Sequence, residues 1–441
     1  MHFYSTNHNA PKVALRDAVA SGTAPDGGLY MPDEIIPLPL PFFRNISDMA
    51  ATDIAYVVAN TLLGEDLDPE TVRETVNEAL SFEMPFRKLD EERRISTLEL
   101  FHGPTMSVKD IGARFMASLL RRLRGQNPEP LHIIAATSGD AGSAVASAFQ
   151  NMADLQVTIL YPKGRLTPVQ KAQFTGLGDN VNAIEVRGSF DDCQALVKTA
   201  SIDPELKDSL RVVTANSINI ARFLPQMFHF FNAYARMVEA GANPANPANI
   251  VISVPSGNLG NLAAGLLAKR MGLPVKRFVA ATNANDALGR YMATGEFVTQ
   301  TTVKTHANAM DTGAPTNLPR VMALYDGRPD ALHEDLQSIA LSDERIIAAI
   351  RELNDRYGYV ADPHSACAYA ALCDCLAPGE EGLFLSTAHP AKCPEVMTEA
   401  LGYSIPSPSL SPHISGPVKM PLTAAPVFQS IKHILKTISK A

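Results

Sequence analysis

The sequence lacks the surplus of positive charge that binding to nucleic acid requires. Its 38 lysines and arginines are outnumbered by 46 aspartates and glutamates, which gives a formal net charge of −8. Contacts with a phosphate backbone need a basic surface, so the composition argues against a nucleic-acid-binding protein. A phosphorylated small molecule remains compatible with this charge, because its binding site needs only a few local donors.

Long apolar runs and an N-terminal secretory signal are also missing. No segment approaches the roughly 18 apolar residues that span a bilayer, and the most apolar early stretch, IIPLPLPFF, is short and interrupted by proline. The five cysteines are an odd number spread along the chain, and the spacing of Cys373 and Cys375 does not suit a zinc site. These features predict reduced thiols, a cytoplasmic location, no metal and no contact with a membrane.

A regular alternation of short β-rich runs and helical stretches begins near residue 131. The runs include LHIIAAT, LQVTILYP and NIVISVP, and each precedes a segment with helical periodicity. Apolar strands that alternate with amphipathic helices predict an α/β fold with parallel sheet, in which ligands bind at the carboxyl ends of the strands. After Ser404 a proline-punctuated tail ends in a short basic helix, which we expect to dock on the protein. The apolar stripe of this helix comprises Val427, Ile431, Ile434 and Ile438.

Two segments rich in small residues occupy such strand ends. The first follows NIVISVP and comprises Ser256, Gly257, Asn258, Leu259, Gly260 and Asn261. The second follows LHIIAA and comprises Thr137, Ser138, Gly139, Asp140, Ala141, Gly142 and Ser143. Free N–H groups at a helix N-terminus favour phosphate in the first segment and a carboxylate or phosphate in the second. A tight turn and an ordinary helix cap are the respective structural alternatives.

A lysine and a group of donors stand at two further junctions. Lys109 immediately precedes a predicted helix that ends near Arg124, and the helix dipole there should lower the lysine pKa towards the neutral amine of Schiff-base chemistry. A solvated lysine at a loop end is the alternative. Ser217, Asn219 and Arg222 crowd hydroxyl, amide and guanidinium groups that suit a second phosphate, with helix capping as the alternative.

Together these segments resemble the threonine synthases, which are pyridoxal-phosphate enzymes of the tryptophan synthase β fold group. Nine blocks carry the resemblance, and they occur in family order between about residues 1 and 402. They are PDGGLYMP, LELFHGPTMSVKDIGARFMA, ATSGDAGSA, NSINIARFLPQ, VPSGNLGN, ATNAND, NAMDTGAPTN, DPHSACAYAAL and LSTAHPAK.

The resemblance implies that Lys109 forms a Schiff base with pyridoxal 5'-phosphate. It implies that residues 256–261 hold the cofactor phosphate, that Asp140 belongs to the cofactor contacts, and that Thr387 is the hydroxyl partner of the pyridine nitrogen. The rest of residues 137–143 would hold the substrate carboxylate, and Ser217, Asn219 and Arg222 the substrate phosphate. Ala141 stands where the family usually has threonine, so one hydroxyl contact is absent.

The family fold is α/β, with two open, mainly parallel twisted sheets flanked by helices, here after a mostly helical N-terminal unit. The expected divisions are an N-terminal unit at 1–95, a smaller α/β domain at 96–235 that carries Lys109, a larger α/β domain at 236–403 and a tail at 404–441.

The implied activity converts O-phospho-L-homoserine and water to L-threonine and phosphate, the last step of threonine biosynthesis. Two alternatives remain open. A related phospholyase would release phosphate and a keto acid, and a non-catalytic protein would only bind the cofactor or another ligand. Dehydratases and cysteine synthases usually have asparagine where Asp140 stands. The sequence does not indicate the oligomeric state.

Overall fold

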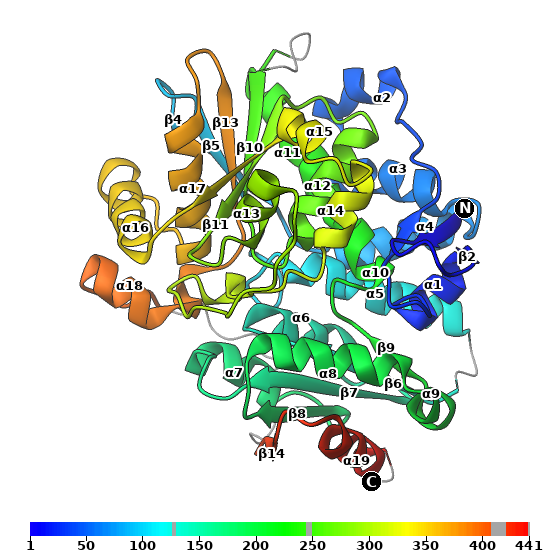
Figure 1. Ribbon diagram of the computed structural model, residues 1–441. Coiled ribbons are helices and arrows are strands. Elements are labelled where there is room, and N and C mark those ends of the chain that lie inside the picture. The colour runs from blue at the N-terminus through cyan, green and yellow to red at the C-terminus, as the bar shows by residue number, and fades with distance from the viewer. Residues whose placement is uncertain (126–128, 244–248, 407–419, 440–441) are drawn as a thin grey trace.

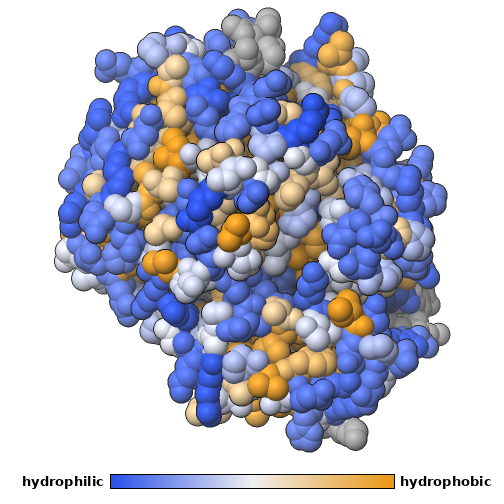
Figure 2. All heavy atoms as spheres, viewed as in Figure 1, coloured by the Kyte–Doolittle hydropathy of each residue, from blue (hydrophilic) through white to orange (hydrophobic). Residues whose placement is uncertain are grey.

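The computed structural model describes residues 1–125, 129–243, 249–406 and 420–439. Two parallel-rich sheets, each covered by helices, form two connected parts, and the N-terminal helices pack to one side of the larger part (Figure 1). This arrangement confirms the predicted fold class. The face drawn in Figure 2 is mainly hydrophilic with separate apolar patches, as is usual for folded proteins. Among the described residues, no helix is long and apolar enough to cross a membrane.

The N-terminal unit contains a small antiparallel sheet, ordered β2-β1-β3, beside its helices. The sequence pattern did not reveal this sheet, because its strands are only two to four residues long. At the start of helix α4 the Asp68 side chain accepts the Thr71 N–H, and a proline occupies the first helical position. The elements are β1 (His2–Ser5), β2 (Val13–Ala14), α1 (Leu15–Ser21), β3 (Tyr30–Pro32), α2 (Leu40–Asn45), η1 (Ile46–Asp48), α3 (Ala51–Leu63) and α4 (Pro69–Ala79).

A five-stranded, fully parallel sheet forms the smaller part and has the order β14-β8-β7-β6-β9. Its strands are β6 (Leu131–Ala136), β7 (Leu155–Pro162), β8 (Val181–Val186), β9 (Val212–Thr214) and β14 (Leu422–Ala424). Its helices are α6 (Asp140–Phe149), α7 (Pro168–Thr175), α8 (Phe190–Ile202), α9 (Pro204–Leu210) and α19 (Phe428–Ile438).

The C-terminal helix α19 docks on α8, as expected for the tail (Figure 1). Ile431 and Leu435 are fully buried at this contact. Val427, which was expected on the apolar stripe, precedes the helix and is 53% exposed. The buried stripe is therefore centred on Ile431 and Leu435, four residues apart on one helix face.

A six-stranded sheet forms the larger part and has the order β12-β11-β10-β13-β5-β4, with only the β4–β5 pair antiparallel. Its strands are β4 (Phe86–Asp90), β5 (Ile95–Glu99), β10 (Ile250–Pro255), β11 (Arg277–Thr282), β12 (Leu336–Ala340) and β13 (Glu381–Ser386). The remaining helices are α5 (Lys109–Arg124), α10 (Ile220–Phe223), η2 (Leu224–Met227), α11 (Phe228–Glu239), α12 (Gly260–Arg270), α13 (Ala287–Thr294), η4 (Asn308–Met310), α14 (Leu318–Leu324), α15 (Pro329–Asp335), α16 (Asp343–Tyr357), α17 (Pro363–Cys375), η5 (Pro390–Lys392) and α18 (Pro394–Leu401).

Each of the two large sheets contains strands from more than one of the ranges that were expected to be separate domains. All of strand β5 except Ile95 falls within 96–235, but the strand pairs with β13 of the six-stranded sheet. Strand β14 of the tail joins the five-stranded sheet. The alternation of strands and helices gives the order of elements along the chain, but it does not say which sheet a strand joins. The chain therefore crosses between the two parts more than once.

Candidate active site

Lys109 is the first residue of α5 and lies where the two parts of the fold meet. Its N–H donates to Ser107 Oγ at 3.4 Å, and the carbonyl of Thr387 accepts the N–H of Val108 at 2.9 Å, which ties this loop to the end of β13. Burial, reinforced by the nearby Arg222, lowers the pKa of Lys109 to about 8. A lysine with such a pKa supplies the neutral amine that nucleophilic and basic chemistry needs.

A cavity opens beside Lys109, and segments far apart in the sequence line it. They are the start of α5, the β6–α6 loop, the β9–α10 loop, the β10–α12 loop and the end of β13. These loops meet because the carboxyl ends of parallel strands share one edge of each sheet. The predicted site residues that line the cavity are Lys109, Ser138, Asp140, Ala141, Ser217, Arg222, Gly257, Asn258, Leu259, Gly260, Asn261 and Thr387.

The β10–α12 loop presents its backbone to the cavity in a tight conformation. A Cβ atom on Gly257 would lie 2.4 Å from the Cα of Met310, so only glycine fits there. Leu259 adopts a left-handed φ of 60°, which is uncommon for a branched residue. Helix α12 then begins at Gly260, and its first-turn N–H groups have no partners within the helix. Such a helix start suits a phosphate.

Arg222 brings a buried positive charge to the same cavity. Its side chain is almost fully buried, and Nη1 donates to the Ala215 carbonyl at 2.5 Å. Nε is buried without a hydrogen-bond partner. Burial lowers the pKa of Arg222 to about 10, although the negative charge of nearby Asp110 acts in the opposite direction. A buried guanidinium with an unsatisfied N–H is a suitable place for an anion.

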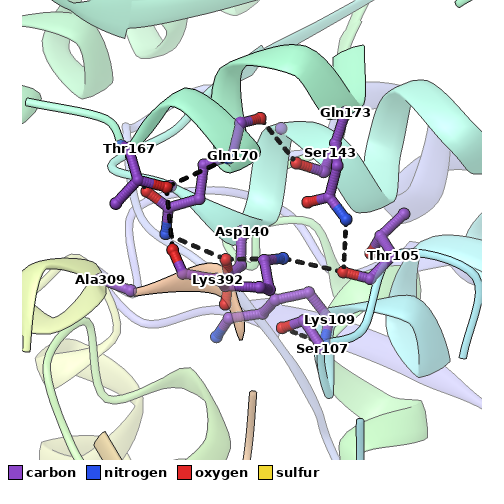
Figure 3. A network of polar contacts seen from close by, with 12 residues as sticks. Thr105, Ser107, Lys109, Asp140, Ser143, Thr167, Gln170, Gln173, Ala309 and Lys392 are labelled. Atoms are coloured by element: carbon purple, nitrogen blue, oxygen red, sulfur yellow. Dashed lines mark hydrogen bonds and ion pairs between the residues drawn. The ribbon is translucent and has the colours of Figure 1, made fainter. Parts of the chain in front are cut away.

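Asp140, the first residue of α6, also lines the cavity and lies beside Lys392 and Gln170 (Figure 3). Its Oδ1 forms an ion pair with Lys392 Nζ at 2.8 Å and accepts a hydrogen bond from Gln170 Nε2 at 3.2 Å. Burial by itself raises the pKa of Asp140, but Lys392 and His364 outweigh burial and hold it below its ordinary value. The cavity therefore contains one anion among several cations.

Six predicted site residues lie behind the lining and support the loops. Thr137 Oγ1 accepts the N–H groups of Gly139 and Gly142 at 3.0 and 2.9 Å. The Asn219 side chain caps α10 and donates to the carbonyls of Val19 and Thr214. Asn219 thus performs the helix capping that was the alternative for its segment, whereas α6 has no side-chain cap at its N-cap residue Gly139. The six residues are Thr137, Gly139, Gly142, Ser143, Asn219 and Ser256.

The structure also adds lining residues that the sequence reasoning did not select. Asn216 directly precedes Ser217 in the block NSINIARFLPQ, so it could have been selected from the sequence as a neighbour of a predicted site residue. His364 was not selected either. Its Nδ1 contacts Asp362, and the ring lines the cavity, where Nε2 accepts the Ala309 N–H at 3.1 Å. The full set is Ser107, Val108, Phe190, Asn216, Pro255, Ala309, Met310 and His364.

Comparison with known protein families gives the class of enzyme to which this fold and cavity belong. A family model described as pyridoxal-phosphate dependent enzyme matches residues 88–384, and a second model, described as threonine synthase N terminus, matches residues 2–80. The first match covers more than half of the chain. The chain is therefore a pyridoxal-phosphate-dependent enzyme, and its cofactor is pyridoxal phosphate.

Similar proteins narrow the class. The chain is 42% identical to the threonine synthase of Serratia marcescens over 408 residues, which is 92% of each protein. The crystal structure of threonine synthase from Escherichia coli superposes with a TM-score of 0.92 at 38% identity, covering 99% of this chain and 100% of that one. The pyridoxal-phosphate-bound threonine synthase from Brucella melitensis gives a TM-score of 0.88 at 30% identity, with both chains fully covered. The chain belongs to the threonine synthase family.

Proposed function

We propose that this protein converts O-phospho-L-homoserine and water to L-threonine and phosphate. The observation that carries the proposal is that one cavity contains both Lys109, whose pKa is lowered, and Arg222, whose buried Nε has no hydrogen-bond partner. A second anion-binding element, the start of α12, lines the same cavity. The cofactor phosphate would bind at the start of α12, and the substrate phosphate would bind at Arg222.

The lining residues fit pyridoxal phosphate. Lys109 supplies the amine for the Schiff base, and the N–H groups at Gly260 and Asn261 would hold the cofactor phosphate in a loop too tight for a side chain at Gly257. Thr387, at the carboxyl end of β13, would face the pyridine nitrogen. When bound, the cofactor ring accepts electron density from the substrate and so makes its carbon-bound protons removable.

The side chains of the cavity would orient the substrate and move its protons. Arg222 and Ser217 would bind the phosphate that leaves from Cγ, because a guanidinium recognises phosphate through charge-assisted hydrogen bonds. Ser138 and the neighbouring backbone would bind the substrate carboxylate. The amine of Lys109 would take the proton from Cα and return protons later in the reaction, since its pKa lies near neutral pH. Water would then add at Cβ.

The test is to incubate the cofactor-loaded protein with O-phospho-L-homoserine and to quantify phosphate and amino acid together. Equal amounts of phosphate and threonine are expected. Phosphate with a keto acid would instead identify a phospholyase, and no turnover would identify a protein that only binds ligands. A Lys109→Ala variant is the matched control, because it should retain the fold and lose both products.

We also expect a cytoplasmic location. All five cysteines are free thiols, and Cys193, Cys367 and Cys393 are buried. Free thiols are typical of reducing compartments. Fractionation of cells that express the full chain checks this expectation, and recovery outside the cytoplasm would contradict it.

A further inference from the structure

Asp191, the second residue of α8, connects the two parts of the fold. Helix α8 itself packs on β6, β7 and β9 of the five-stranded sheet (Figure 1). The Asp191 carboxylate nevertheless accepts three hydrogen bonds from the segment between α13 and α14, which belongs to the larger part. Thr302 Oγ1 and the N–H of Gly313 donate to Oδ2, the latter at 3.2 Å. Thr312 Oγ1 donates to Oδ1 at 2.8 Å.

The neighbouring residue caps the helix and so leaves Asp191 free for these contacts. Asp192 forms the capping box of α8, in which its Oδ2 accepts the Ser189 N–H at 2.7 Å. Gln194, three residues beyond Asp191, extends the bridge between the two parts, because its Oε1 accepts Asn258 Nδ2 at 3.2 Å. Asn258 lies in the β10–α12 loop that lines the active cavity. One turn of α8 therefore reaches both the α13–α14 segment and this loop.

Asp191 also lies between two outer cavities that adjoin the active cavity. The first shares Asn216 with the active cavity, and the second shares Ser138 and Phe190 with it. Both include exposed residues, and Phe297, which lines the first, is 40% exposed. Asp191 lines both outer cavities but not the active cavity. Opening of the Asp191 hydrogen bonds would therefore join these cavities into one cleft.

The segment that Asp191 holds has little support of its own. Residues 295–307 contain no helix or strand, and most of residues 295–304 are exposed. Such a segment opens at a lower free-energy cost than the sheets beside it. A further bridge, from Asn308 to the start of α7 and the loop before it, consists of neutral hydrogen bonds of 3.2 and 3.3 Å. The charge-assisted bonds to Asp191 are stronger.

We propose that Asp191 is a positioning residue that holds the two parts together across the entrance of the active cavity, and that its hydrogen bonds must open whenever a ligand enters or leaves. This role rests on the proposed function only in so far as ligands bind in that cavity. Because Asp191 does not line the active cavity, its removal should change how fast a ligand passes and not how tightly the ligand binds. The Kd stays constant when the association and dissociation rate constants rise by the same factor.

The passage of pyridoxal phosphate is measured in the Lys109→Ala background, where no covalent bond to the protein forms. Stopped-flow absorbance gives the association rate constant, and dilution of the complex gives the dissociation rate constant. Adding Asp191→Ala should raise both rate constants about tenfold, because the loss of three charge-assisted hydrogen bonds favours the open form. The Kd should change by less than about twofold. An unchanged association rate constant, or a Kd weakened through dissociation alone, would overturn the proposal.

Asp192→Ala is the matched control, because it removes a carboxylate from the adjacent residue of the same helical turn. It abolishes the capping box and should lower the Tm. It leaves the bridge to the larger part intact, so both rate constants should equal those of the background. Equal acceleration in Asp192→Ala would mean that any loosening of α8 opens the cavity, and it would contradict the specific role of Asp191.

Hydrogen exchange gives a second measurement that does not depend on the Lys109→Ala background. The N–H of Gly313 donates to Asp191 Oδ2 and to Thr302 Oγ1, so its exchange rate reports on the opening of the bridge. Asp191→Ala in the otherwise natural, cofactor-loaded chain should accelerate this exchange about tenfold, and Asp192→Ala should not. An unchanged exchange rate in Asp191→Ala would refute the inference. Neither measurement requires turnover, so failure of the proposed reaction is recognised separately, by the absence of threonine from the cofactor-loaded natural protein.

Discussion

Replacing Arg222 with methionine should weaken phosphate binding and stabilise the cofactor-free protein at the same time. The guanidinium is buried, and its Nε has no hydrogen-bond partner. Its Nη1 donates to the main-chain carbonyl of Ala215. A group that is present for a ligand costs stability while the ligand is absent. The substitution therefore separates a binding role from a structural one.

The stability change follows from the pKa. Burial lowers the pKa of Arg222 from 12.5 to about 10, and at 1.36 kcal/mol per pH unit the charged form costs about 3 kcal/mol in the folded state. Because the folded pKa is the lower one, this full cost applies at every pH below about 10, including neutral pH. Loss of the hydrogen bond to the Ala215 carbonyl destabilises the variant by about 2 kcal/mol. Because removing the buried charge stabilises it by about 3 kcal/mol, the free energy of unfolding of Arg222→Met should rise by about 1 kcal/mol. Calorimetry of the apoenzyme should show an equal or higher Tm.

The activity change follows from the lost hydrogen bonds to phosphate. Each charge-assisted bond contributes about 1.5–3 kcal/mol, so kcat/KM for O-phospho-L-homoserine should fall roughly 10- to 100-fold. Inhibition by inorganic phosphate should weaken by a similar factor. Steady-state kinetics with phosphate as inhibitor measures both effects on one enzyme preparation.

Arg320→Met is the matched control. Arg320 is also fully buried, and burial lowers its pKa to about 9. Its guanidinium, however, donates to three main-chain carbonyls and to Asn317 Oδ1, and it stacks on Phe223 at 4.1 Å. Five such bonds to these four acceptors, at about 2 kcal/mol each, outweigh the cost of burial. Its removal should lower the Tm.

Comparing the Tm of the two arginine variants tests whether Arg222 serves phosphate binding or the stability of the fold. If Arg222→Met lowered the Tm as strongly as Arg320→Met and left phosphate inhibition unchanged, Arg222 would be a structural residue. The assignment of the substrate phosphate to this side of the cavity would then be wrong.

Three further predictions concern other parts of the molecule. The rate at which the apoenzyme takes up pyridoxal phosphate should depend on pH with a midpoint near pH 8 and should fall about tenfold per pH unit below it. Burial lowers the pKa of Lys109 to about 8, and only the neutral amine reacts. A midpoint near pH 10, measured by stopped-flow absorbance, would contradict this. Burial raises the pKa of Glu380, but Arg277 and a neighbouring lysine outweigh burial and lower it to about 2, so Glu380→Gln should cost about 2 kcal/mol at pH 7. This difference is present above pH 4.5 and disappears as the pH falls towards 2, and denaturant titrations that show no such convergence would refute it. Leu435→Ala should cost about 2–4 kcal/mol because the side chain is fully buried against α8, whereas the half-buried Ile434→Ala should cost clearly less in the same denaturation assay.

The sequence was sufficient for the fold class and for most of the cavity. Strand and helix periodicity located β6, β7 and β10, and the polar loops after β6 and β10 do line the cavity. Helix α5 ends at Arg124 as expected and begins at Lys109, which was expected just before the helix. These features depend on local patterns, which a single sequence records directly.

Long-range pairing was beyond the reach of such patterns. Strand β5 joins β13, and the ion pair of Lys392 with Asp140 connects segments 252 residues apart, as the residue numbers show. His364 could not be selected from the sequence, because its contact with the cavity depends on where α17 packs. In the two polar loops, hydroxyls that cap the backbone and hydroxyls that face a ligand have the same sequence signature. Thr137 and Ser138 were distinguished only by the structure.

Carrying out the reaction in water labelled with oxygen-18 tests the central claim most directly. The account predicts cleavage of the Cγ–O bond and addition of water at Cβ, so the hydroxyl of threonine should carry the label and the released phosphate none. Mass spectrometry of both products decides the question. Label in the phosphate, with homoserine as the organic product, would mean hydrolysis at phosphorus and would contradict the account.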